Sequence, residues 1–171
     1  MPTSNDDASE GARERTTSPF TIRVDDLRSP AVLALLREHL ALAAANSPPG
    51  SVHALDADAL RGSNVTFWSV WLGSELAGIG ALKQLDAAHG ELKSMRTVRA
   101  HLRKGVATTL IRHMLQVAKQ RGYRRLSLET GTTEPFAAAQ ALYQRFGFAR
   151  CAPFASYRDD GFSICMTRTL D

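Results

Sequence analysis

The segment Leu102-Arg-Lys-Gly-Val-Ala107 lies between an apolar strand and a strongly amphipathic helix, and it decides the fold. Small residues at Gly105 and Ala107 leave the first amides of the helix open to close approach. Those amides have no partner within the helix and lie at the positive end of its dipole, so they favour an anion. Arg103 and Lys104 add positive charge. The segment therefore predicts a phosphate-binding loop without a catalytic role, with a basic turn that caps a surface helix as the alternative.

The helix after this loop is expected over residues 105–120, with Gly122 as its stop. A strand over residues 91–98 precedes it, and a short strand over residues 126–129 follows it. Strand, helix and strand of this length form a crossover, so we expect the two strands to be parallel neighbours. The loop is not a P-loop, because G-x-x-x-x-G-K-[ST] is missing, and the antiparallel strands before it exclude a dinucleotide-binding turn.

The rest of the chain alternates between strand and helix patterns. Short turns at Gly73-Ser-Glu75 and His89-Gly90 predict an antiparallel meander in the centre. Thr132 or Thr133, with Pro135, opens a second helix that reaches Phe146. These patterns predict an α/β fold with a mixed, mostly antiparallel sheet. Further strands are expected over residues 20–24, 65–71, 76–85, 148–154 and 162–168, and further helices over residues 31–45 and 54–60.

Length and composition limit the class of protein. The 171 residues carry a formal net charge of +4, which suits one domain with a polyanionic ligand, a nucleic acid or an acidic surface as partner. We expect a disordered tail over residues 1–18 and one domain over residues 19–171. Two cysteines and no cluster with ligand spacing predict buried thiols and no metal. Without a signal peptide or a membrane span, a cytoplasmic location is the default.

Two motifs resemble those of the GNAT superfamily of N-acetyltransferases. Met95-Arg-Thr97 with the Arg103-Lys-Gly-Val-Ala107 loop is similar to its motif A, and Ala139-Gln-Ala-Leu-Tyr143-Gln-Arg-Phe-Gly-Phe148 is similar to its motif B. Residues 91–97 and 127–131 further resemble a bacterial subgroup labelled auxin acetyltransferases. Leu102 and Phe136 depart from the usual motifs. The resemblance implies a GNAT fold with about six to seven strands and about four helices.

The same resemblance implies acetyl-CoA as the co-substrate and a small molecule with a primary amine as the acceptor, joined by direct transfer. Backbone groups at Met95, Arg96 and Thr97 are expected to pair with the pantetheine like an added strand. The diphosphate is expected against the loop and first helical turn. This donor-binding segment comprises Arg103, Lys104, Gly105, Val106, Ala107 and Thr108.

Three side chains are candidates for the transfer chemistry. Tyr143 matches the family tyrosine that faces the CoA sulfur, and a phenol with a pKa near 10 can protonate a departing thiolate. Glu91 corresponds to the catalytic glutamate of histone-type relatives, with Glu129 as the rival base and a solvated carboxylate as the alternative for either. On an ideal strand Glu91 shares a face with Lys93 and Met95, unless a bulge breaks the alternation.

The acceptor site is expected near His53, which is either a ligand for the acceptor or a histidine at the surface. Phe67, Trp68 and Trp71 are better explained by sheet packing than by base stacking. Two other hypotheses stay open from the sequence: a CoA-binding sensor without catalysis, and a basic nucleic-acid-binding domain. No nucleic-acid or membrane partner is expected, and homodimerisation is left open.

Overall fold

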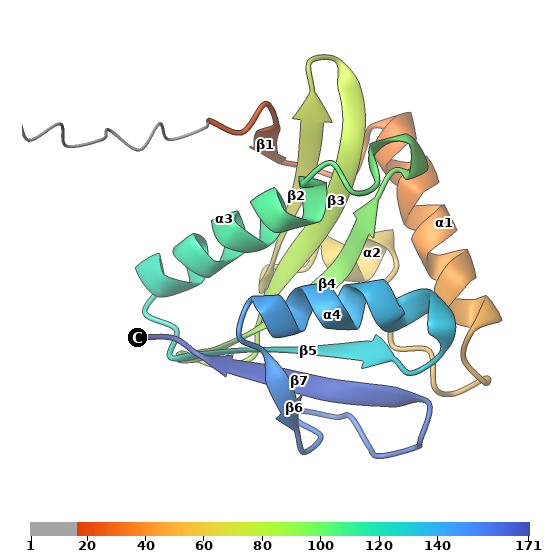
Figure 1. The fold of residues 1–171 in the computed structure, drawn as a ribbon, viewed down its shortest axis with the longest axis vertical. Coiled ribbons are helices and arrows are strands. Elements are labelled where there is room, and N and C mark those ends of the chain that lie inside the picture. Colours follow the sequence, from red (N-terminus) through yellow and green to blue (C-terminus); the bar gives the residue numbers. More distant parts are fainter. Residues whose placement is uncertain (1–16) are drawn as a thin grey trace, which may run out of the picture.

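The structure is a computed structural model that describes residues 17–171. The tail predicted over residues 1–18 therefore lies outside the described residues, except for Thr17 and Ser18. Within the described part, seven strands form one sheet that is covered by helices on both faces (Figure 1). The strands are β1 (Thr21–Val24), β2 (Val65–Leu72), β3 (Glu75–Gln84), β4 (His89–Thr97), β5 (Arg125–Gly131), β6 (Ala149–Cys151) and β7 (Ser163–Thr169). The helices are α1 (Pro30–Ala45), α2 (Ala57–Leu60), α3 (Val106–Gln120) and α4 (Ala137–Arg145), with short 3₁₀ turns at Arg99–His101 and Glu134–Phe136.

The sheet has the order β1-β2-β3-β4-β5-β7-β6. Strands β2 to β4 form the predicted antiparallel meander, because tight turns join each to the next. The strand β1 pairs antiparallel with β2 at the edge of the sheet, although α1 and α2 separate the two strands in the chain. The helix α3 connects β4 to β5, and these two strands are the parallel pair of the described sheet. The predicted crossover and the mixed, mostly antiparallel sheet are both confirmed.

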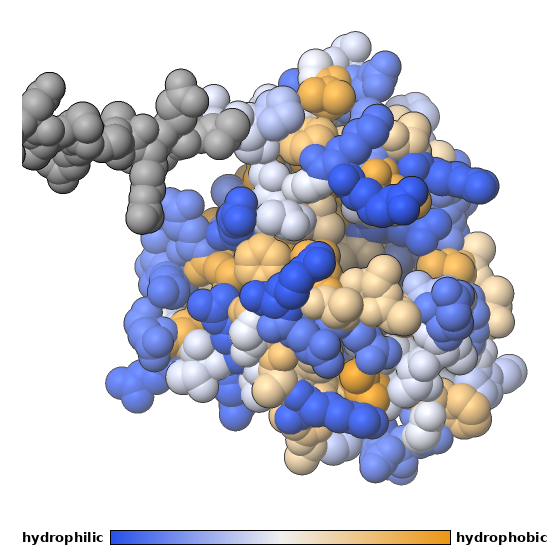
Figure 2. Space-filling model, in the orientation of Figure 1, coloured by the Kyte–Doolittle hydropathy of each residue, from blue (hydrophilic) through white to orange (hydrophobic). Residues whose placement is uncertain are grey.

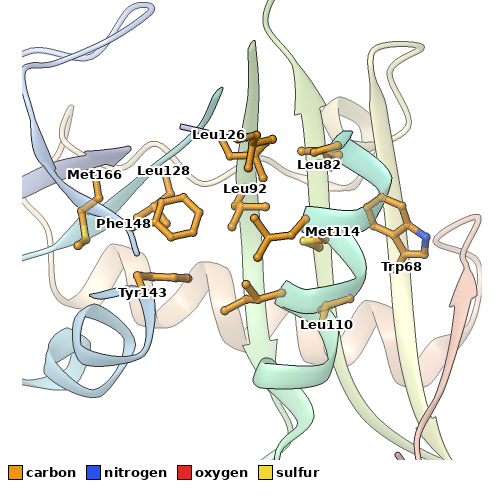
Figure 3. Packing of buried hydrophobic residues seen from close by; sticks show 14 of the residues in the cluster. Trp68, Leu82, Leu92, Leu110, Met114, Leu126, Leu128, Tyr143, Phe148 and Met166 are labelled. Carbon is orange, nitrogen blue, oxygen red and sulfur yellow. The ribbon is translucent and has the colours of Figure 1, made fainter. Parts of the chain in front are cut away.

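Two apolar layers hold the helices against the sheet. On one face, Leu110 and Met114 of α3 pack on Leu82 and Leu92 of the sheet, as Figure 3 shows. Each of these side chains is buried, and such burial stabilises the fold by about 1.5–3 kcal/mol per side chain. The other face is covered by α1 and α2, whose buried residues contact Phe67, Ile79 and Ala81. Trp68 is also buried in the first layer, so sheet packing accounts for it as expected.

Three predicted boundaries were wrong. The helix α2 begins at Ala57 rather than Ala54, because the Asp56 carboxylate caps it by accepting from the Ala59 amide at 2.9 Å. The turn predicted at His89-Gly90 belongs to β4, since His89 is buried with its Nε2 2.7 Å from the Ser127 hydroxyl. The strand expected over residues 148–154 is limited to β6, with three residues.

A β-bulge interrupts β4 in its second half. Ile79 pairs with Arg96 and Ala81 pairs with Lys93, so that Gly80 faces two residues, Ser94 and Met95. Ser94 takes the left-handed conformation that the extra residue requires, with φ of 55°. Glu91 and Lys93 therefore do not share a face with Met95, whose side chain packs in the α3 layer.

Gly80 is expected to tolerate no side chain beside this bulge. A Cβ at this position would lie 2.7 Å from Met95 Sδ and 2.8 Å from Leu110 Cδ2. Gly80→Ala should lower the free energy of unfolding by about 1–3 kcal/mol, because the layer is already filled. Urea denaturation measures the loss. Met95→Ala makes room, so the double variant should lose less than the sum of the two single losses, whereas strict additivity would contradict the contact.

Candidate active site

The parallel ladder between β4 and β5 ends halfway along both strands. Pairing runs from His89↔Arg125 to Leu92↔Leu128, and no further pair joins the two described strands. The bulge at Ser94 follows directly on β4. Backbone groups of β4 beyond Lys93 therefore face an opening rather than a neighbouring strand. Two clefts open there, one on each side of the gap.

The first cleft lies between β4, α4 and the loop before α3, with a volume of about 320 Å³. It is the hollow beside α4 in Figure 2, and strongly hydrophilic side chains gather along the loop side. We call it the donor cleft. Its lining includes eight of the predicted donor-binding residues: Met95, Arg96, Thr97, Arg103, Gly105, Val106, Ala107 and Thr108. Lys104 does not line it and is exposed.

The N-terminus of α3 is built for close approach by a ligand. Gly105 caps the helix with φ of 89°, and nothing lies within 4 Å of the position that a Cβ would occupy. Arg103, with φ of 59°, is also left-handed. The first residues of α3, which follow these two left-handed residues, line the donor cleft, and their free amides can bind an anionic group there.

The second cleft, which we call the acceptor cleft, lies between β4, α1 and the segment before α2. Its volume is about 180 Å³, below the roughly 300 Å³ at which pockets for drug-sized ligands begin. Its titratable lining consists of His39, His53, Lys93, Arg96, Glu129 and Tyr143. The two clefts share five lining residues, and these form the junction between them: Met95, Arg96, Pro135, Ala139 and Tyr143.

Tyr143 stands at this junction. It reaches from α4 towards the sheet, beside Phe148, and its side chain is 8% exposed (Figure 3). Burial, with a smaller contribution from the negative charge of Glu129, raises the pKa of Tyr143 to about 12. The phenol therefore keeps its proton at neutral pH and can donate it at the point where the two clefts meet.

The two candidate carboxylates occupy different environments. Glu91 is 2% exposed, does not line either cleft, and accepts hydrogen bonds from Lys93 Nζ at 3.0 Å and from the Tyr157 hydroxyl. Glu129 lines the acceptor cleft. Burial raises the pKa of Glu129 above its usual range, although a hydrogen bond from Ser163 opposes the shift.

Glu91, Lys93 and Tyr157 form a three-residue cluster, of which Lys93 lines the acceptor cleft. Lys93 Nζ also donates to Tyr157 Oη at 2.6 Å, so each member contacts the other two. Burial and the charge of Glu91 raise the pKa of Tyr157, which stays protonated. The rings of His53 and Tyr157 are nearly perpendicular, with centroids 4.9 Å apart. His53 thus lines the acceptor cleft, as the hypothesis of an acceptor ligand requires.

Sequence reasoning missed Tyr157, His39 and the side chain of Lys93. Tyr157 lies in the loop between β6 and β7, and no motif or spacing singles it out. His39 is on the apolar stripe of α1, where a histidine resembles a core residue. Its role in the cleft wall depends on the packing of α1 against β4, which only the folded chain shows.

Among residues 17–171, no group of three or more His, Cys, Asp and Glu side chains is placed to hold a metal ion. The helices of this part of the chain are too short or too polar to cross a membrane. His101 lines the donor cleft, and its Nε2 lies 3.4 Å from Glu75. His113 instead packs edge-on against Trp68, with ring centroids 5.3 Å apart.

The fold and the two clefts define a class of enzyme that sequence comparison identifies. The acetyltransferase (GNAT) family model matches residues 32–148, more than half of the chain. The chain belongs to the GNAT acetyltransferase family. It is 57% identical over 151 residues to the uncharacterized N-acetyltransferase YedL of Escherichia coli (strain K12), a match that covers 88% of this chain and 95% of YedL. The resemblance inferred from the two motifs is confirmed.

Solved structures support the same fold. A protein of Klebsiella pneumoniae, proposed to be an acyl-CoA N-acyltransferase, matches with a TM-score of 0.71 and 25% identity, covering 91% of this chain and all of its own. A GNAT family acetyltransferase from Elizabethkingia anophelis, solved with acetyl-CoA bound, matches with a TM-score of 0.63 and 19% identity. That match covers 90% of this chain and 100% of the other. The predicted GNAT fold and acetyltransferase activity are thus confirmed.

Proposed function

We propose that this enzyme moves an acetyl group from acetyl-CoA directly to the primary amine of a small molecule. The observation that carries the proposal is the junction of two clefts at Tyr143, one suited to an anionic donor and the other small and polar. The acetyl-CoA bound to the Elizabethkingia anophelis relative supports the choice of donor. A cytoplasmic location stays a prediction from the sequence, and homodimerisation stays open.

The residues of the donor cleft fit acetyl-CoA, which supplies an activated acetyl group as a thioester. The open amides at Gly105 and the start of α3 bind the diphosphate, and Arg103 and Lys104 add positive charge. The unpaired edge of β4 from Met95 to Thr97 offers backbone groups to the pantetheine amides, as an edge strand does to a peptide. No side chain needs to move out of the way at Gly105.

Tyr143 acts as the general acid in this proposal. Its raised pKa keeps the phenol protonated, so that it can offer its proton to negative charge that develops beside it. Tyr143 lines both clefts, which supports this role.

Glu129 is the better candidate for the general base. It lines the acceptor cleft, whereas Glu91 is enclosed by Lys93 and Tyr157. The raised pKa of Glu129 also makes it a stronger base than an exposed carboxylate. In this scheme Glu91 is a positioning residue, because it binds Tyr157 and the cleft residue Lys93, while His53 orients the acceptor.

Donor binding gives the first prediction. Gly105→Glu should abolish the rise in Tm that acetyl-CoA produces, because a carboxylate would occupy the place of the diphosphate. The matched control is Gly122→Glu at the other end of α3, where φ is also positive at 77° and the space is equally open. The control should carry a similar backbone strain and keep the acetyl-CoA shift. An unchanged shift in Gly105→Glu would contradict the proposed diphosphate site.

The acid role is tested by Tyr143→Phe. We expect kcat to fall by about 10²- to 10⁴-fold, as the loss of a general acid does, with the Kd for acetyl-CoA unchanged. Thiol release during a screen of amines measures turnover. Tyr123→Phe is the control, because it removes another buried hydroxyl that lies outside both clefts. If wild-type protein binds acetyl-CoA yet acetylates none of the amines, the hypothesis of a CoA-binding sensor replaces the enzyme.

The base role predicts a pH dependence. Glu129 must be ionised to accept a proton, and its pKa is raised, so kcat/KM should fall on acidification at a higher pH than an ordinary carboxyl group would cause. Glu129→Gln should lower kcat by about 10²-fold or more and should change the acidic limb of the pH profile, which is the fall of kcat/KM at low pH. Glu134→Gln, at an exposed position in the 3₁₀ turn before α4, should leave the profile unaltered. An identical acidic limb in Glu129→Gln would rule out this base.

A further inference from the structure

Arg96 lines the acceptor cleft from β4, directly after the bulge. Because the bulge inserts one residue, Arg96 returns to the face that carries Glu91 and Lys93, and it shares the cleft with His39 of α1. The charge of Arg96 also acts on His39. Burial is the largest cause, and the positive charges of Arg96 and Lys93 add to it, so that the pKa of His39 is lowered to about 4. His39 is therefore neutral at physiological pH.

No acidic partner neutralises Arg96 within residues 17–171. The ion pairs of this part of the chain join Arg28 to Asp26, Arg61 to Asp58, Lys93 to Glu91 and His101 to Glu75. The Nε of Arg96 is buried and has no hydrogen-bond partner. A buried guanidinium donor without an acceptor is costly, and a bound ligand that supplies the acceptor would remove this cost.

The other cation of the cleft is already satisfied. Lys93 is bound to the Glu91 carboxylate at 3.0 Å and to the Tyr157 hydroxyl at 2.6 Å. With Lys93 neutralised and His39 uncharged, the free positive charge of this wall resides on Arg96. Its planar guanidinium matches a carboxylate, which can accept two parallel hydrogen bonds from it.

A carboxylate of the protein lines the same cleft. Glu129, on β5, lies on the other side of the gap from β4 and offers an acceptor for an amine. The cleft thus presents a positive group and a negative group in about 180 Å³, which suits a small ligand with both charges. Leu42, Val52 and Phe136 add apolar lining between them.

We propose that Arg96 binds a carboxylate of the acceptor, and that the acceptor is therefore an amine with a carboxylate of its own, as in a free amino acid. This inference rests on the proposed function, because it takes the second cleft as the acceptor site. Arg96 acts on specificity: it holds the acceptor so that the amine lies near Glu129 and Tyr143. An amine that lacks the carboxylate leaves the guanidinium unpaired and binds weakly.

The experiment compares amino acids with the corresponding amino-acid amides, which differ by the charge of one group. Steady-state kinetics with acetyl-CoA and thiol detection should show a lower KM for the acids in the wild-type enzyme. Arg96→Gln should raise the KM for the acids by about 10- to 100-fold, because a charged hydrogen bond is lost, and leave the KM for the amides unchanged. Arg96→Lys should recover part of the loss.

Arg99→Gln is the matched control, since Arg99 is an exposed arginine just beyond β4 that lines neither cleft. A wild-type enzyme that uses amides as well as acids would overturn the inference. So would an Arg96→Gln variant that raises the KM for acetyl-CoA and not for the amino acid, because the anion at Arg96 would then be a phosphate of the donor.

Calorimetric titration of the amino acids in the presence of CoA separates this inference from the proposed function. Binding to the wild-type protein that is lost in Arg96→Gln supports the carboxylate site even without turnover, in which case the proposed acetyl transfer has failed alone. Turnover of uncharged amines, with no binding of amino acids, would reject Arg96 as the carboxylate site while acetyl transfer stands.

Discussion

The interruption of the β4–β5 ladder is the constraint on which the rest of the site depends. Parallel pairing ends at Leu92↔Leu128, and the bulge at Ser94 turns the following backbone of β4 away from its neighbour. A continuous ladder would satisfy these backbone groups within the sheet and leave no space between the strands. Because the ladder stops, the sheet offers an unpaired edge in its own interior, and both clefts open from that edge.

Most of the fold follows from local patterns in the sequence. The amphipathic stripe of α3, the stop at Gly122 and the short turns of the meander are each encoded within a few neighbouring residues, so they could be predicted. Two of the three boundary errors occurred where tertiary contacts decide a boundary, whereas the start of α2 is set by its local cap at Asp56. His89 looks like a turn residue beside Gly90, yet its hydrogen bond to Ser127, 38 positions away, keeps it in β4. The length of β6 is likewise set by its pairing with β7.

The candidate site also has one part that local sequence predicts and another that depends on tertiary contacts. The donor segment around Gly105 was predictable, because its chemistry lies in one short loop at a helix terminus. The acceptor cleft was not, because its walls come from four separate parts of the chain. Tyr157 meets Glu91 across 66 positions of sequence, and Arg96 faces the cleft through a one-residue bulge that strand alternation does not reveal. The family resemblance predicted that the backbone of Arg96 binds the pantetheine, and it gave no role to the side chain.

The shared wall of the two clefts has a consequence for the order of binding. Residues such as Met95 and Tyr143 border both spaces, so a ligand in one cleft completes the boundary of the other. The two affinities are then linked, and thermodynamic reciprocity requires each ligand to change the affinity of the other by the same factor. We therefore expect a ternary complex to form before any bond is made, with the five junction residues acting as the physical coupling between the two substrates.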